Sequence, residues 1–388
     1  MKLKGYKRPD GRVGFRNHVL VIPTCACSTE TCQKVAEQVP GVKTIVNQNG
    51  CGEVFESIKI TRRVLTGFAA NPNVFACIVI GLGCELNEIK EQIDQIRSRT
   101  DKPLESLVIQ EEGGTIKTIG KAVKMAAGFR RQASLCEREE VDPSSIILGT
   151  ECGGSDSTSG IGANPVLGVT CDKIIGAGGT AVLSETTEFI GAEHLLARRA
   201  ATPEVGEKIL KIVSDYERHL LKAGQDLRRG QPGPGNKDGG ITTLEEKSLG
   251  CIHKGGSRPI MDVVGYAEEV RKKGLVVMDT PGYDVASVTG MVAGGCQVIA
   301  FTTGRGTPTG CAIAPVIKVT ANRATYENMK DNMDFDASDV VLRKRSIDAL
   351  GEELMQEVVE ILNGKQTKAE SFGFGFSEIA MNRICNYI

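Results

Sequence analysis

The sequence predicts an α/β fold with mostly parallel sheets, and three observations lead to it. Short apolar runs alternate with longer segments of helical pattern along most of the 388 residues. The runs are apolar throughout, as in "VLVIPT" (19–24) and "SIILGTE" (145–151), which is typical of strands buried on both faces. They end in glycine-rich turns, and the 46 glycines follow no collagen-like period. Strand–helix–strand alternation of this kind indicates sheets covered by helices on both sides.

The elements follow one another in a regular order. We expect buried strands at 19–24, 43–46, 77–81, 104–110, 145–151 and 180–186, and within 274–284 and 297–306. We expect helices at 30–39, 87–98 and 164–178, each after one of these strands. The similarity of the strand–turn units predicts two related Rossmann-like or flavodoxin-like units, although no fixed-period repeat is present.

One segment interrupts the alternation. Residues 222–259 are rich in glycine and proline, and over 230–240 their density argues against regular structure. The segment also carries charged and polar residues, and a loop of this length inside a compact chain tends to be functional. We therefore divide the chain into an N-terminal α/β unit (1–221), a functional loop or linker (222–259) and a C-terminal α/β unit (260–388).

Composition excludes several classes of partner. Acidic and basic residues nearly balance, 48 against 47, and tryptophan is absent, so neither net charge nor aromatic content favours nucleic-acid binding. No apolar run is long enough for a membrane span. The start "MKLKGYKRPDGR" has no apolar stretch of the kind found in secretory signals. An odd number of cysteines, 13, in such a chain indicates reduced thiols and a cytoplasmic location.

Several apolar runs end on cysteine. In open parallel sheets, ligands bind at the carboxyl ends of the strands. Thiolates and carboxylates converging from separate strands suit iron, either as a single ion or as a cluster with an open position. We favour a mononuclear ferrous ion that grips and polarises a 2-hydroxycarboxylate. The cysteines that close such turns are Cys51, Cys84, Cys152 and Cys311.

Other chemistries are less well supported by the motifs. "GLGCEL" lacks the third glycine of a dinucleotide fingerprint, and the chain has no Gly-Lys-Ser/Thr phosphate loop. Cys25 and Cys27 have a poor spacing for structural zinc. A nucleophilic cysteine needs a histidine base, and none of the four histidines has a diagnostic spacing to a thiol. In "TTGRGTPTG" (302–310), the arginine between two glycines predicts a turn that binds an anion through Arg305.

Long motifs over nearly the whole chain resemble the altronate/galactarate dehydratase family. They include "GYKRPDGRVGFRNHVLVIPT", "NPNVFACIVIGLGCE", "ECGGSDSTSGIGANPVLG", "LSETTEFIGAEHLL", "PGNKDGGITTLEEKSLG", "VMDTPGYD" and "FTTGRGTPTG". The family comprises iron-dependent lyases that act on sugar acids, together with sulfolactate sulfo-lyase. The resemblance implies β-elimination, in which a base removes a proton from one carbon and a hydroxyl or sulfonate leaves the next.

The resemblance also implies a set of site residues. As catalytic groups it implies Arg16, His18, Glu185, His194, Lys237 and Asp279. As substrate-binding groups it implies Asn17, Asp156, Asn236 and Arg305. It adds Glu85 to the four cysteines as a metal ligand, and Glu188 and Glu193 as further site members.

The substrate and the partner are also expectations from the resemblance. "PTCACSTETC" and "QEEGGTIKT" are more similar to the large subunit of sulfolactate sulfo-lyase, which favours sulfolactate over a sugar acid. Single-chain dehydratases of the family begin with a SAF-type domain that this sequence lacks. We therefore expect a separate small subunit of about a hundred residues and an oligomeric enzyme. The alternative from another class is a metal-binding scaffold whose chemistry lies in that small subunit.

Overall fold

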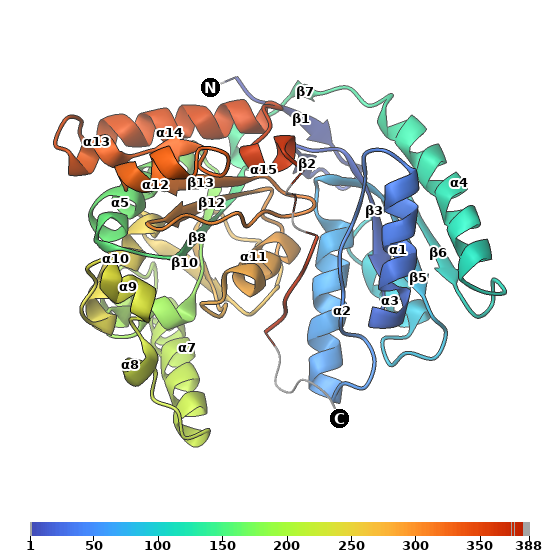
Figure 1. Cartoon of the computed structure of the whole chain (residues 1–388), viewed down its shortest axis with the longest axis horizontal. Coiled ribbons are helices and arrows are strands. Elements are labelled where there is room, and N and C mark those ends of the chain that lie inside the picture. Colours follow the sequence, from blue (N-terminus) through green and yellow to red (C-terminus); the bar gives the residue numbers. More distant parts are fainter. Residues whose placement is uncertain (1, 374, 376, 383–388) are drawn as a thin grey trace.

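The computed structural model describes residues 2–373, 375 and 377–382. Its elements form two α/β units that lie side by side (Figure 1). Each unit is built on a parallel sheet, and a small antiparallel sheet of order β2-β1-β7 lies near the N-terminus. The predicted α/β class with mostly parallel sheets is confirmed.

The first unit has a four-stranded parallel sheet of order β4-β3-β5-β6. Helices α1 and α4 cover one face, while α2 and α3 pack together against the other. Its strands are β3 (His18–Pro23), β4 (Val42–Thr44), β5 (Val74–Gly81) and β6 (Leu104–Val108). Its helices are α1 (Ala26–Gln38), α2 (Phe55–Ala70), α3 (Ile89–Arg97) and α4 (Thr115–Ala133). The small sheet contains β1 (Lys4–Lys7), β2 (Val13–Gly14) and β7 (Glu139–Glu140).

The second unit has a seven-stranded parallel sheet of order β10-β11-β9-β8-β12-β13-β14. Its strands are β8 (Ile147–Gly153), β9 (Thr180–Leu183), β10 (Ile260–Val264), β11 (Gly274–Met278), β12 (Val298–Thr303), β13 (Val316–Thr320) and β14 (Phe335–Asp336). Its helices are α5 (Asn164–Gly176), α6 (Glu193–Arg198), α7 (Pro203–Lys222), α8 (Leu227–Gly230), α9 (Pro234–Asp238), α10 (Leu244–Ile252), α11 (Asp284–Ala293), α12 (Arg323–Asn328), α13 (Ser338–Val341), α14 (Ile347–Leu362) and α15 (Lys368–Ser371).

The division of the chain at 222–259 is wrong for the sheets. Strand β9 pairs with β11, and β8 pairs with β12, so strands from both sides of this segment belong to one sheet. The segment itself is not irregular, because it contains the short helices α8, α9 and α10. The alternation of strands and helices is a local signal, whereas the pairing of strands depends on long-range packing that no local pattern reports. The boundary between the two sheets lies instead between α4 and β8.

Helices α2 and α11 join the two units. One hydrophobic cluster contains residues of both, including Phe68 on α2 and Met291 on α11. The helices cross where a Cβ on Gly67 would lie 2.2 Å from the carbonyl oxygen of Ala293, so a larger residue would separate them. Nearby, the amide of Asn71 donates to the carbonyl oxygens of Val292 and Cys296 at 2.8 and 3.0 Å. The packing of α2 against α11 therefore fixes the position of one unit relative to the other.

No helix among the described residues is long and apolar enough to cross a membrane.

Candidate active site

Among the described residues, a compact group of thiol, carboxylate and amine side chains lies at the carboxyl end of strands β8 and β9. Cys152 is on β8, Glu185 follows β9, and Cys251 is at the end of α10. Lys254 lies in the 3₁₀ turn His253–Gly255 that continues α10. Strand order reverses at β8, since β9 lies on one side of it and β12 on the other. Ligands bind at such switch points in open α/β sheets.

Lys254 connects these groups. Its Nζ lies 2.6 Å from Glu185 Oε2, 2.8 Å from Cys251 Sγ and 3.5 Å from Cys152 Sγ. The two sulfur atoms are 3.6 Å apart, and the Cys152 N–H donates to Glu185 Oε2 at 2.9 Å. All four residues are buried, and Lys254 is fully inaccessible. Burial disfavours the ammonium, but the surrounding thiols and carboxylates outweigh it and raise the pKa of Lys254 well above its ordinary value.

The backbone of Glu185 is held in an uncommon conformation. Its φ of 72° lies in the left-handed region, which costs a residue other than glycine about 1–3 kcal/mol. The Glu185 N–H donates to Thr280 Oγ1 at 2.7 Å, and the Thr186 N–H donates to the Thr280 carbonyl at 2.9 Å. These bonds from the end of β11 aim the carboxylate at Lys254. Strain of this kind is concentrated at functional sites.

The surroundings of this group are acidic. Burial, together with the charge of Glu185, raises the pKa of Glu151 well above its ordinary value and that of Asp284 to about 7. Burial also raises the pKa of Glu188 despite its ion pair with Lys247. Glu151 Oε1 and Glu188 Oε2 are buried and have no hydrogen-bond partner among the described residues. Carboxylates thus outnumber ammonium groups, four (with Glu185) against two.

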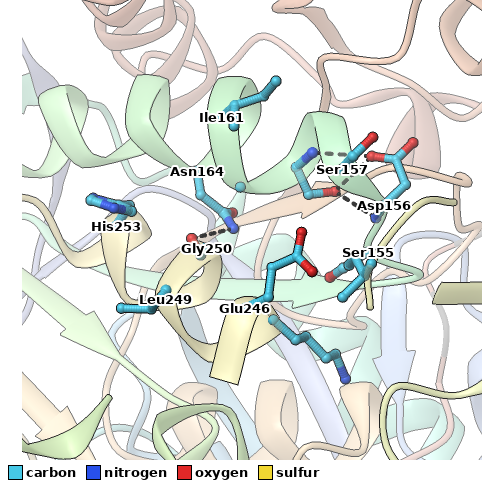
Figure 2. Close-up of a pocket in the computed structure, with 13 residues that line it drawn as sticks. Ser155, Asp156, Ser157, Ile161, Asn164, Glu246, Leu249, Gly250 and His253 are labelled. Carbon is cyan, nitrogen blue, oxygen red and sulfur yellow. Dashed lines mark hydrogen bonds between the residues drawn. The ribbon is translucent and has the colours of Figure 1, made fainter. Parts of the chain in front are cut away.

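A cavity of about 240 Å³ (Figure 2) is lined by residues adjacent in the chain to members of this cluster, Gly250 before Cys251 and His253 before Lys254. Lys247 connects the two, because it lines the cavity and its Nζ contacts Glu188 Oε1 at 2.8 Å. The floor is held by Asn164, whose amide donates to the Gly250 carbonyl at 2.9 Å (Figure 2). The lining residues are Ser155, Asp156, Ser157, Ser159, Gly160, Ile161, Asn164, Ile241, Glu246, Lys247, Leu249, Gly250 and His253.

Asp156, predicted to bind substrate, is the anchor of the loops around the cavity. Its Oδ1 accepts hydrogen bonds from Thr158 Oγ1, the Ser159 N–H and Ser159 Oγ, and its Oδ2 accepts one from Asn322. A Cβ on Gly304 would lie 2.2 Å from Asp156 Cγ, so that turn packs directly on the carboxylate. Asp156 is 3% exposed. Its position fits a role in holding these loops rather than direct contact with a ligand.

The predicted anion turn and the 234–238 segment lie together. Arg305 Nη1 donates to the Gly235 carbonyl at 3.4 Å, and Asn236 Nδ2 donates to the Ser155 carbonyl at 2.8 Å. Arg305 and Lys237 are both exposed. Asn236 therefore fastens the helix α9 to the cavity wall, while the two cations remain free to meet an anion from solvent.

The predicted metal ligands of the first unit are not brought to Cys152. Among the described residues, the group of three or more His, Cys, Asp or Glu with ligand atoms within 4.8 Å is Cys152, Glu185 and Cys251. Cys51 and Cys84 are exposed. Glu85 is buried and accepts hydrogen bonds from Thr24 Oγ1 at 2.6 Å and the Gly83 N–H at 2.6 Å. These bonds outweigh burial and lower its pKa, so this carboxylate holds its own turn.

The "GFRNH" residues have structural partners away from this site. Arg16 forms an ion pair with Glu370, with Nε 2.7 Å from Oε1. Asn17 accepts a hydrogen bond from Arg8 at 2.8 Å. Burial and the nearby cations Lys43 and Arg16 lower the pKa of His18 to about 3, so its ring is neutral near pH 7. These contacts fit a role in joining the N-terminal segment to the C-terminal region.

Of the remaining predicted site residues, one lies beside the cluster and two lie elsewhere. Asp279, at the end of β11, accepts a hydrogen bond from Thr186 Oγ1 at 2.6 Å and so lies beside Glu185. His194 is exposed on α6. Cys311 is half-buried and lines a different cavity, together with His18 and Glu370.

Two members of the cluster, Cys251 and Lys254, and the neighbouring Lys247 were missed as site residues. All three come from the segment interpreted as a loop or linker. A usable signal was present, because Cys251 and Lys254 are three residues apart and share a face if the segment is helical.

The donor set tests whether this site suits iron. Two thiols and a carboxylate are ligands that iron accepts, and their ligand atoms converge within 4.8 Å. A cation already stands among them, since Lys254 Nζ contacts all three. Glu151 Oε1 and Glu188 Oε2, nearby carboxyl oxygens without a hydrogen-bond partner among the described residues, add further acceptors to the site. The residues of the cluster therefore fit a divalent ion of this kind.

Comparison with known proteins agrees with the position of the sheet boundary. A family described as "D-galactarate dehydratase/Altronate hydrolase, second domain" matches residues 5–134, and "D-galactarate/Altronate dehydratase, C-terminal" matches residues 143–386. Altronate dehydratase of Bacillus subtilis is 34% identical over 96% of this chain and 76% of its own length. Altronate dehydratase of Escherichia coli is 34% identical over 95% of this chain and 75% of its own length.

A third relative is matched over almost its full length. The (2R)-sulfolactate sulfo-lyase subunit beta of Chromohalobacter salexigens is 38% identical over 95% of this chain and 94% of its own length. The named activities of these relatives are eliminations. With both family models matched and identity above 30% over nearly all of its length, this chain belongs to the D-galactarate/altronate dehydratase family of lyases.

Proposed function

We propose that this chain is the catalytic large subunit of an enzyme that carries out β-elimination on a small 2-hydroxycarboxylate, with 3-sulfolactate as the favoured substrate and pyruvate and sulfite as products. The observation that carries the proposal is the buried Glu185–Lys254 pair beside a cavity that Lys247 and Glu188 connect to it. Elimination next to a carboxylate needs a base and cations within a few ångströms of each other. This cluster supplies both.

Glu188 is the best candidate for the base. One of its oxygens is held by Lys247 and the other has no partner among the described residues. Its raised pKa brings it closer to neutral pH, which favours proton abstraction. In the reaction, this oxygen takes the proton from C2 of the substrate, and negative charge develops on the substrate carboxylate. Lys247, which lines the cavity, is placed to stabilise that charge.

The leaving step needs no second base. As the C2=C3 bond forms, the C3–S bond breaks and sulfite departs with the electron pair. The enol that remains takes a proton at C3, loses the proton of its C2 hydroxyl and becomes pyruvate. Sulfite leaves as a stable anion, so the site mainly needs positive charge near it. Arg305 and Lys237, whose side chains are exposed, are the groups that we propose supply this charge.

Ferrous iron belongs to the proposal as the cofactor. Cys152, Cys251 and Glu185 are the residues that would hold it. When bound, such an ion supplies a Lewis acid that polarises a substrate oxygen. The polypeptide groups then orient the substrate and move the proton.

A second substrate class is favoured by one observation. Three serines, Ser155, Ser157 and Ser159, line the cavity together with Asn164. Hydroxyl and amide groups suit the hydroxyls of a hexonate, as in the named substrate of the altronate dehydratases. In that case hydroxide would leave from C3 with a proton, and the product would be a 2-keto-3-deoxy acid.

We also propose a partner. The sulfo-lyase relative that this chain matches over 94% of its length is named as a subunit beta. By analogy, this chain would act with a small SAF-type subunit that covers the cavity and excludes water.

The test is an assay of the chain prepared without oxygen, with ferrous iron, alone and with a co-expressed small subunit. We expect sulfite and pyruvate in equal amounts from 3-sulfolactate, and greater turnover with the small subunit present. A 2-keto-3-deoxy acid from a hexonate, with no sulfite from sulfolactate, would replace the favoured substrate by the second. No product from either substrate class would contradict the catalytic proposal and favour the scaffold alternative.

A further experiment tests the anion turn. Arg305→Lys keeps the charge but loses the planar guanidinium. If the substrate is held by two parallel hydrogen bonds, kcat/KM should fall by an amount that corresponds to a loss of about 1–3 kcal/mol in transition-state stabilisation. Lys237→Arg is the matched control, because it keeps the charge on the neighbouring exposed segment. Unchanged kinetics for Arg305→Lys would remove this turn from substrate binding.

A further inference from the structure

Lys254 occupies the place that a metal ion would take. Its Nζ is within 3.5 Å of both thiol sulfurs and within 2.6 Å of the Glu185 carboxylate. A divalent ion bound to the same three atoms would lie a few ångströms from a fully buried ammonium. At that separation, inside a protein, the repulsion between the two cations is large. The three ligands therefore cannot serve the lysine and a metal ion at the same time.

The backbone around Lys254 is fixed. A Cβ on Gly168 of α5 would lie 2.3 Å from the carbonyl oxygen of His253, so the turn packs tightly on that helix. The Cys171 thiol donates to the Lys254 carbonyl at 3.2 Å. If the ammonium leaves the three ligands, it must do so by rotation of its side chain rather than by movement of the turn.

Acceptors for a displaced ammonium are present nearby. Glu151 Oε1 and Glu188 Oε2 are buried without partners among the described residues, and both carboxyl groups interact electrostatically with Lys254. Unsatisfied buried carboxylate oxygens are uncommon. Here they are the acceptors to which we expect the ammonium to move.

We propose that Lys254 is an internal counter-cation, which pairs with Glu185 and contacts the sulfur atoms of Cys251 and Cys152 when no metal is bound, and that a divalent ion enters only by displacing its ammonium toward Glu151 and Glu188. The inference rests on the proposed function only in taking these three residues as the metal ligands. Its consequence is that the lysine weakens metal binding and keeps the metal-free cluster from carrying buried, unpaired charge.

The experiment is a titration of the metal-free full chain with Co²⁺ in the absence of oxygen, followed by the sulfur-to-cobalt charge-transfer band. Lys254→Met should bind Co²⁺ at least tenfold more tightly than the wild type. Lys318→Met is the matched control, because Lys318 is also buried in this unit but, within the described part of the chain, its Nζ donates to the carbonyls of Thr309 and Val316 and to no thiol or carboxylate. The control should bind as the wild type does, and Cys152→Ala should abolish the band in every background.

A second variant and a second measurement keep the test valid if Lys254→Met folds poorly. Lys254→Gln keeps a hydrogen-bond donor for Glu185 without the charge, and Co²⁺ should raise its Tm by more than it raises that of the wild type. Equal or weaker Co²⁺ affinity in both Lys254 variants would overturn the proposal, as would a band that survives loss of Cys152. Lyase activity is measured separately: tighter cobalt binding in a chain without activity would reject the proposed function and leave this inference standing.

Discussion

The carboxyl edges of the two sheets look alike in sequence and differ in structure. Each has an apolar strand that runs into a glycine-cysteine turn with a neighbouring glutamate, Gly83-Cys84-Glu85 after β5 and Glu151-Cys152-Gly153 at the end of β8. Cys84 is exposed, whereas Cys152 is only 4% exposed.

The carboxylates differ in the same way. Glu85 has its lone pairs satisfied by local donors, and its pKa is lowered. Glu151 has one oxygen without a partner among the described residues, and its pKa is raised well above the ordinary value. The difference comes from the segment that covers the carboxyl edge of the second sheet. The 222–259 segment, with α10 and its 3₁₀ turn, brings Cys251 and Lys254 over the second edge. Burial turns one of two similar patterns into a reactive cluster.

The largest expected effect is on kcat, and it distinguishes substitution of Glu185 from substitution of Glu85. Glu185→Gln removes the negative charge that pairs with Lys254 and a proposed ligand of the metal, so kcat should fall by at least about tenfold. Glu85→Gln should leave kcat nearly unchanged and lower the free energy of unfolding by about 1–3 kcal/mol, because it disturbs a hydrogen-bonded turn. Steady-state kinetics and urea unfolding measure the two quantities. Similar losses of kcat in both variants would contradict the inference that the two sheet edges have different roles.

The next effect is on metal content. Cys152→Ser should lower the iron bound to protein prepared without oxygen by at least about tenfold, since loss of a ligand costs more than loss of a supporting contact. Cys51→Ser and Cys84→Ser should keep the wild-type iron content, because both thiols are exposed on the other sheet. Iron analysis of the three variants is the measurement. Loss of iron in the Cys51 or Cys84 variant would restore the first edge as a metal site.

A smaller effect concerns pH and stability. The pKa of Asp284 is raised to about 7 by burial and by Glu185, so the unfolded state releases this proton before the folded state does. Stability from this group is full below the unfolded pKa of about 4 and is lost as pH rises through about 7. Asp284→Asn removes the titration, so its stability relative to the wild type should increase by about 2–3 kcal/mol between pH 5 and pH 8.

Unfolding of metal-free protein in urea at the two pH values measures this difference. Glu85→Gln should show no comparable change between these two pH values, because a lowered carboxyl pKa contributes stability that is lost only as pH falls below the unfolded pKa of about 4. Parallel pH profiles for the two variants would contradict the assignment of opposite environments.

The smallest effect is expected from the exposed thiols. Cys27, Cys51 and Cys84 should react quickly with iodoacetamide in the native protein, whereas Cys152 and Cys251 should react only after unfolding. Replacing the three exposed cysteines by serine should change kcat/KM by less than about threefold and stability by about 0.5 kcal/mol or less. Mass spectrometry of the alkylated peptides identifies which thiols react, and rapid labelling of Cys251 would show that the second edge is open.

The sequence alone determined the fold class and the existence of most strands. Apolar runs such as those ending at Gly81 and Glu151 are local signals, since burial on both faces leaves a continuous apolar pattern. It also determined the family, because long motifs persist over nearly the whole chain. Of the predicted site residues, Cys152, Glu185 and Asp279 lie at one edge.

Only the tertiary structure decided which of the similar edges is buried and which side chains meet there. Cys251 and Lys254 are about a hundred residues from Cys152 in the chain, at separations of 99 and 102, and no periodicity connects them. The same holds for the pairing of β9 with β11 across the 222–259 segment. Local patterns report what each segment can form, whereas strand pairing, burial and the resulting pKa values arise from contacts between segments that fold together.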